Sequence, residues 1–187
     1  PTGSKPSQMA EAQEAPTETA SAQTTPTKTT PIKTTTEPEK TTQIVTPTPK
    51  VPTVTIAISC ETILNNLNKF NKNKLSVLPE NGIILSPQIV VFQEGESVFD
   101  ILKLETQALK IPLDFRYYPF FKSVYINGIN NIYEMDCGPS SGWTYKVNGI
   151  FPNYGQDQYI LKDGDIIEIV YTCDGGPDVG LSFAGGS

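Results

Sequence analysis

The stretch SGWTYKVNGIFPNYGQDQYILKDGDIIEIVYTC, residues 141–173, decides the fold. Apolar and polar residues alternate over 143–147, which is the pattern of a half-buried strand. The Asn148-Gly149 pair that follows is typical of a two-residue turn, because both central positions of a type I′ turn need positive φ. A short strand is expected at 159–161, then a turn at Asp163-Gly164 and a strand of β-branched and aromatic residues at 166–172. The stretch therefore predicts short strands joined by turns, and it holds no catalytic motif.

The residues upstream predict further strands, among them one at 89–92, a short amphipathic helix over 63–70 and one principal helix. Residues 53–60 alternate between apolar and polar, as in a strand with one buried face. Ser97 can cap a helix, with Asp100 in the capping-box position, and Pro112 ends it. Further strands are expected at 113–118 and 124–126, on both sides of Pro119-Phe120-Phe121, with a tight turn at Asn127-Gly128. This order predicts an α+β fold, a mixed sheet of short strands packed on one main helix.

The first part of the chain has a different composition. Residues 1–52 are rich in Thr, Pro, Lys and Glu and contain few large apolar side chains. Such a segment cannot bury enough surface to offset its chain entropy, so we expect a disordered, semi-extended linker or stalk. The folded domain is expected at 53–180, with a flexible tail at 181–187.

Charge and composition exclude several classes of function. The formal net charge of −6 and a pI near 4.7 argue against nucleic-acid binding. The chain contains no histidine, which excludes Ser-His-Asp and Cys-His catalysis and almost all catalytic zinc sites. We therefore expect a protein that is not an enzyme. The sequence has no run of 18 apolar residues and no recognisable signal peptide.

Several motifs occur together in an order that resembles a known family. They are SGW-x-YKVNG, PNYG, LKDGD-x-IE and YTCD within 141–174, together with ISCETIL at 58–64 and ESVFDILK at 96–103. The chain from about 54 to 180 resembles bacterial cell-surface domains related to the C-terminal domain of transcobalamin and intrinsic factor. The resemblance implies a β-grasp-like fold, an extracellular position on the cell surface, and binding of a corrinoid or another soluble ligand.

Three cysteines, Cys60, Cys137 and Cys173, allow three pairings and leave one thiol over. In the β-grasp-like fold that the resemblance implies, the first and last strands are neighbours, which favours Cys60–Cys173. Members of that family often carry cysteines at the positions of Thr106 and Gln156, so a second disulfide is expected to be missing. Cys137 then has no obvious partner, and an internal thioester to Gln156 or Gln107 is a remote alternative.

Aromatic residues are the main candidates for a binding site. The first group lies in and beside the predicted hairpin and consists of Trp143, Tyr145, Phe151, Tyr154 and Tyr159. A second group consists of Tyr117, Tyr118, Phe120 and Phe121. Aromatic side chains are enriched at recognition surfaces, but they also fill cores. Phe151 and Tyr154 are the stronger candidates for binding, because function concentrates on loops.

These features predict a non-catalytic extracellular module that binds a soluble small molecule, such as cobalamin, and needs no cofactor. The alternative is an adhesion or spacer domain that contacts a surface protein or a glycan. In either case we expect attachment to the cell envelope through the N-terminal stalk and no nucleic-acid partner. Acidic residues in glycine-rich turns, such as Asp163 and Asp174, offer oxygen ligands for Ca²⁺. Turn chemistry explains them without a metal, so no metal site is assigned.

Overall fold

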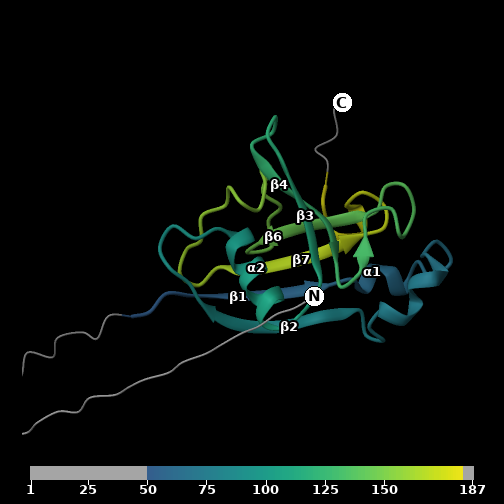
Figure 1. The fold of residues 1–187 in the computed structure, drawn as a ribbon, viewed down its shortest axis with the longest axis horizontal. Coiled ribbons are helices and arrows are strands. Elements are labelled where there is room, and N and C mark those ends of the chain that lie inside the picture. Colours follow the sequence, from purple (N-terminus) through teal and green to yellow (C-terminus); the bar gives the residue numbers. More distant parts are fainter. Residues whose placement is uncertain (1–49, 183–187) are drawn as a thin grey trace, which may run out of the picture. The chain divides into compact units, whose positions relative to one another are not determined.

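The structure, a computed structural model, describes residues 50–182. The predicted linker at 1–52 lies almost wholly outside the described residues, as does most of the tail at 181–187. The described part is a mixed α+β domain with two sheets of short strands, as the sequence predicted. One sheet has the order β2-β1-β7-β6 and the other the order β3-β4-β5 (Figure 1). The strands are β1 Thr53–Ser59, β2 Ile83–Val91, β3 Leu113–Tyr118, β4 Ser123–Ile129, β5 Ile132–Tyr133, β6 Gly142–Val147 and β7 Ile166–Thr172.

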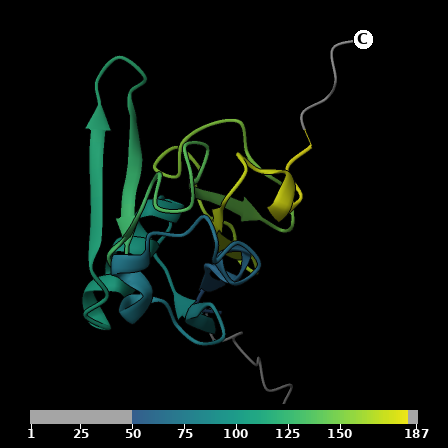
Figure 2. The same cartoon turned by 90° about the vertical axis from the view of Figure 1, so that its right-hand side faces the viewer.

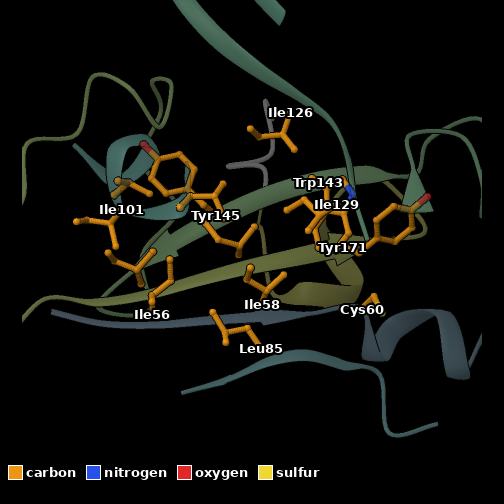
Figure 3. Close-up of a cluster of buried hydrophobic side chains, with 14 of the residues drawn as sticks. Ile56, Ile58, Cys60, Leu85, Ile101, Ile126, Ile129, Trp143, Tyr145 and Tyr171 are labelled. Atoms are coloured by element: carbon orange, nitrogen blue, oxygen red, sulfur yellow. The ribbon is translucent and has the colours of Figure 1, made fainter. Parts of the chain in front are cut away.

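The first and last strands lie side by side in the centre of the four-stranded sheet. β1 and β7 are parallel, with Ile56 opposite Ile167 and Ile58 opposite Ile169. β2 and β6 flank them in antiparallel pairs. A parallel pair between antiparallel neighbours makes the sheet mixed, which confirms the predicted topology class. The alternating burial along β1 and β7 directs the apolar side chains of both strands into one core (Figure 3).

The main helix, α2 (Val98–Ala108), supplies the other side of that core. Val98, Ile101 and Leu102 are fully buried, and Figure 3 shows Ile101 on the same side of the sheet as Tyr145. The predicted capping box is present: the Ser97 hydroxyl accepts from the Asp100 N–H, and the Asp100 carboxylate accepts from the Ser97 N–H. These two bonds satisfy amide groups that the first helical turn leaves without partners.

Replacing Ser97 with alanine should lower the free energy of unfolding by about 1 kcal/mol, since it removes the acceptor for the Asp100 N–H. Ser97 is itself buried, so no water replaces the lost oxygen. Urea denaturation followed by circular dichroism measures the loss. Ser140→Ala, outside any helix cap, is the control. Equal stability of the Ser97 variant and the wild type would contradict this role.

The β3–β4 hairpin forms an arm that extends past the rest of the domain (Figure 2). The predicted turn at Asn127-Gly128 is wrong, because both residues lie within β4. The chain turns instead at Asn130 and Asn131, where both φ angles are positive. Gly128 has a packing role: a Cβ there would lie within 2.8 Å of the Tyr133 ring. The Asn-Gly signal thus marks a close contact rather than a turn.

The minor elements are shorter than the sequence suggests. The amphipathic pattern after β1 produces only α1, Glu61–Leu64, followed by a 3-10 helix at Lys72–Val77. A second 3-10 turn, Pro177–Val179, follows β7. The expected strand at 159–161 is reduced to one bridge between Ser97 and Ile160. Within residues 50–182, no helix is both long enough and apolar enough to cross a membrane.

The disulfide joins Cys137 to Cys173, so the predicted Cys60–Cys173 pair is wrong. The register explains why. Ser59 at the end of β1 pairs with Val170, so Cys60 is level with Tyr171 and Cys173 lies two residues further on. That offset separates the Cα atoms of Cys60 and Cys173 by roughly 8 Å, which is too far for a disulfide. Cys137 arrives from the loop after β5, with its Cα 5.3 Å from that of Cys173.

The pairing also removes the thioester alternative. Cys137 has no free thiol, and the remaining thiol, Cys60, is buried. Burial, assisted by the charge of Glu61, raises the pKa of the Cys60 thiol to about 12. Gln156 is also buried, and its Oε1 has no hydrogen-bond partner among the described residues. Cys60 is therefore an inert core residue rather than a nucleophile.

Candidate functional site

Two of the five predicted binding residues belong to the core. Trp143 and Tyr145 are 7% and 5% exposed. Both lie on the face of β6 that points toward α2 and the second sheet (Figure 3). Trp143 Nε1 donates to the Ile132 carbonyl at 2.9 Å, and its ring meets Tyr171 edge to face. The Tyr145 hydroxyl donates to the Tyr154 carbonyl at 2.8 Å. The strand alternation places both side chains inward, so of the two roles open to aromatic residues on this strand, Trp143 and Tyr145 fill the core.

The other three predicted residues lie on the loop between β6 and β7. Tyr154 is 45% exposed and stacks on the half-buried Tyr159, with ring centroids 6.2 Å apart. Phe151 is half-buried, with the Lys146 ammonium 5.7 Å from its ring centroid. Of these residues, Tyr154 offers the most aromatic surface to a ligand. The structure leaves the predicted binding role of all five residues untested.

Two residues of the second aromatic group, Tyr118 and Phe121, border a largely apolar hollow. This hollow, here called the arm groove, has a volume of about 380 Å³. Its walls are formed by one face of the arm, by Glu134 after β5, and by the β6–β7 loop; the residues are Tyr118, Phe121, Ser123, Val124, Tyr125, Glu134 and Gly155. Tyr118 and Tyr125 meet edge to face with centroids 6.1 Å apart. The arm groove therefore combines aromatic walls with one carboxylate.

Glu134 and Tyr125 form the polar centre of the arm groove. The Tyr125 hydroxyl donates to Glu134 Oε2 at 2.8 Å. Burial, followed by the hydrogen bond and the charge of Glu134, raises the pKa of Tyr125 to about 12. The phenol thus stays a neutral donor at physiological pH and fixes the carboxylate beside the aromatic walls. The carboxylate keeps acceptor capacity for an N–H or O–H of a ligand.

The loop that closes the arm groove is fastened to the arm. Asp157 Oδ1 accepts from the Ser123 hydroxyl and from the Val124 N–H, each at 2.9 Å. Gln158 Nε2 donates to the Lys122 carbonyl at 3.0 Å. Gly155 passes so close to Ser123 that a Cβ would overlap the hydroxyl oxygen. These contacts hold the groove open with defined walls, which favours binding without a large rearrangement.

A second hollow of about 250 Å³ adjoins the arm groove and shares Val124, Tyr125 and Gly155 with it. Its remaining walls come from Ile126 on β4, from β6 and from the loop at 152–156, so three of the predicted binding residues border it: Trp143, Tyr145 and Tyr154. The exposed face of Tyr154 thus extends the same binding surface. A ligand larger than the arm groove could contact both hollows.

A larger hollow of about 460 Å³, between α1 and β7, is mainly polar. Two of its charged side chains form an ion pair, with Lys146 Nζ 3.5 Å from Glu168 Oε1. The carboxylates in the acidic turns also have partners within the chain. Asp178 accepts hydrogen bonds from Thr172 and Cys173, and Asp163 pairs with Lys50. Over residues 50–182 no group of three acidic, histidine or cysteine side chains could hold a metal ion.

The sequence analysis missed the residues that give the arm groove its polarity. Glu134 and Asp157 carry no local motif, because each acts through a contact between different segments of the chain: Asp157 lies 34 residues from Ser123, and Glu134 lies 9 residues from Tyr125. Tyr125 itself carries only the pattern of a strand. The one available signal was the density of aromatic residues on both sides of the hairpin turn at 119–122. That signal marks an exposed arm but gives no information about its neighbours.

No curated protein matches the sequence. Several solved structures are similar, and two of them show the low level of identity. One is a protein from Ruminococcus gnavus described as a candidate metal-binding protein, with a TM-score of 0.39 and 13% identity over 65% of this chain and 96% of that one. The other is haptocorrin in complex with Cbi, with a TM-score of 0.44 and 11% identity over 66% of this chain; the match spans 26% of haptocorrin. The model of a family described as a domain of unknown function (DUF4430) matches residues 95–172, from the turn before α2 to the last residue of β7.

Proposed function

We propose that this domain is a non-catalytic extracellular module that binds a soluble small molecule in the arm groove. The observation that carries the proposal is the pairing of aromatic walls, Tyr118, Phe121 and Tyr125, with a single fixed carboxylate, Glu134. A concave, mostly apolar surface with few polar groups is typical of small-molecule sites. The Cys137–Cys173 disulfide supports an extracellular location, since such bonds persist in oxidising compartments.

The ligand we propose is a corrinoid, which offers a flat macrocycle edged by amide groups. The aromatic walls would contact the macrocycle, and Glu134 would accept from an amide N–H. At about 380 Å³ the arm groove lies at the small end of ligand pockets, so it covers only one side of such a molecule. We therefore expect weak binding by this domain alone and tighter binding when a partner covers the other side.

Neighbouring tyrosines on β3 test the proposal. Tyr118 lines the arm groove, whereas Tyr117 points to the opposite face of the arm because successive strand residues alternate. We expect Tyr118→Ala to weaken corrinoid binding about tenfold or more, the usual scale of an aromatic hot spot. Tyr117→Ala should leave the affinity unchanged. Titration of cyanocobalamin followed by visible absorbance measures both variants against the wild type.

The result also separates the two functions that the sequence allowed. A spectral change that Tyr118→Ala abolishes would support binding in the arm groove. Binding that both variants retain would place the ligand elsewhere. If the wild type gave no spectral change even at millimolar corrinoid, the corrinoid proposal would be wrong, and adhesion to a protein or glycan would become the better explanation of the arm.

A further inference from the structure

The end of the arm carries two phenylalanine side chains that are mostly exposed to solvent. This arm tip consists of Tyr117, Tyr118, Pro119, Phe120, Phe121 and Lys122. Phe120 is 91% exposed and Phe121 69% exposed, and the two rings meet edge to face. Water-exposed phenylalanines are unfavourable, and contiguous exposed apolar surface marks a site of interaction. Figure 2 shows the hairpin extending past the rest of the domain, so the tip is accessible from several sides.

The tip is nevertheless held in a defined conformation. The Phe121 N–H donates to the Tyr118 carbonyl at 3.1 Å, and the Lys122 N–H donates to that of Pro119 at 3.3 Å. Lys122 adopts the left-handed conformation, with φ at +48°, which completes the turn. Behind the tip, the contacts of Asp157 and Gln158 fix the arm to the domain. The phenylalanines are thus presented by a fastened hairpin rather than by a free loop.

Charge on the arm differs from charge on the whole chain. Residues 115–125 contain Arg116 and Lys122 but no acidic residue, whereas the chain has a net charge of −6. The carboxylates on and beside the arm keep their charge and belong to residues outside this segment: Asp114 at the start of β3, Glu134 and Asp157. The two basic side chains are exposed and have no salt-bridge partner among the described residues. Two cations without an ion-pair partner within residues 50–182, at the end of the arm, favour an anionic partner.

We propose that the arm tip inserts into the interface of a phospholipid bilayer that contains anionic headgroups. The side chains follow the polarity of that interface: Phe120 and Phe121 at the end, then the tyrosines and Lys122, and Arg116 further back. Arg116 lies four residues before Phe120, about 10 Å or more along an extended strand, which matches the depth of an interfacial insertion. Tyrosine is enriched at this level of membrane proteins. A lipid surface also accepts a convex tip, whereas a protein partner must offer a matching pocket.

The arm tip and the arm groove share Tyr118 and Phe121, but Phe120 belongs to the tip alone and separates the two sites experimentally. Phe120 does not line the arm groove, so its loss should leave corrinoid titration unchanged. The corrinoid titration and the vesicle experiment can therefore give different outcomes, and each tests only its own proposal. A domain that does both would hold its ligand beside a membrane surface.

Vesicle sedimentation with the full chain tests the proposal. We expect the wild type to bind vesicles of phosphatidylcholine with about 30% phosphatidylglycerol more tightly than vesicles of phosphatidylcholine alone. Phe120→Ser should lower the partition coefficient about tenfold on the mixed vesicles. Lys122→Gln should lower it about fivefold on the mixed vesicles and leave it unchanged on the neutral ones. The control is Ile89→Ser on β2, which removes another exposed apolar residue and should change nothing.

A second readout uses the single natural tryptophan, Trp143, which is buried and gives a constant background. In Phe120→Trp the added indole should shift its emission to shorter wavelength on contact with mixed vesicles. Absence of wild-type sedimentation with mixed vesicles would overturn the proposal, as would equal partition of Phe120→Ser and the wild type. Concentration-dependent dimerisation that Phe120→Ser abolishes, without vesicle binding, would assign the tip to a second copy and would also overturn it.

Discussion

Replacing Trp143 with alanine should lower the free energy of unfolding by about 3–5 kcal/mol, the cost of truncating a large buried aromatic side chain. The indole is 7% exposed, packs edge to face on Tyr171 and donates to the Ile132 carbonyl. The substitution therefore leaves a cavity and an unpaired carbonyl oxygen between the two sheets. Urea denaturation monitored by far-ultraviolet circular dichroism measures the change.

Tyr154→Ala is the matched comparison, because it removes an aromatic side chain from the same predicted binding group. Tyr154 is 45% exposed, so its loss should change stability by less than about 1 kcal/mol. If Trp143→Ala proved as stable as Tyr154→Ala while losing ligand binding, Trp143 would be a ligand contact and its buried position would be wrong. Loss of stability without a change in binding by the remaining folded protein would confirm the structural role.

The two residues show what the sequence could predict. The alternation around Trp143 located β6 correctly, because period-two patterning reflects one buried face. The same pattern cannot say whether a tryptophan on that face fills a core or lines a cleft, since both environments are apolar. Tyr154 was correctly placed on a loop. Its stacking on Tyr159 depends on a fold of the chain that no local signal encodes.

Local signals predicted elements better than they predicted contacts. The Ser97 capping box is a local feature and was found at the predicted position. Asn127-Gly128 carries the same dipeptide signal as Asn148-Gly149, but only the second pair forms a turn. At Gly128 the decisive factor is the Tyr133 ring from the neighbouring strand. Likewise the arm groove needs Glu134 and the β6–β7 loop to meet the arm, which is set by tertiary packing.

The cysteines illustrate the same limit. The resemblance to the transcobalamin-related domains gave adjacent first and last strands, which the structure has. Adjacency was not sufficient, because a disulfide also depends on register. A shift of two residues between Cys60 and Cys173 places the pair out of reach, while the loop after β5 brings Cys137 close.

Removing the Cys137–Cys173 disulfide should lower the free energy of unfolding by about 3–4 kcal/mol, the chain-entropy value for its sequence separation of 36 residues. The double variant Cys137→Ala/Cys173→Ala makes this change without leaving an unpaired thiol from the pair. Dithiothreitol should destabilise the wild type by a comparable amount and should have no effect on the double variant. Urea denaturation measures the free energy of unfolding of the wild type and of the double variant, each with and without dithiothreitol.

Cys60→Ala is the control for the pairing itself. It should keep the mass deficit of about 2 Da that marks one disulfide, and it should keep the response to dithiothreitol. In the wild type, iodoacetamide should modify Cys60 only after unfolding, because burial hides the thiol and raises its pKa to about 12. A non-reducing peptide map that joined Cys60 to Cys173, or a Cys60→Ala variant without the mass deficit, would contradict the observed pairing and restore the one that the resemblance implied.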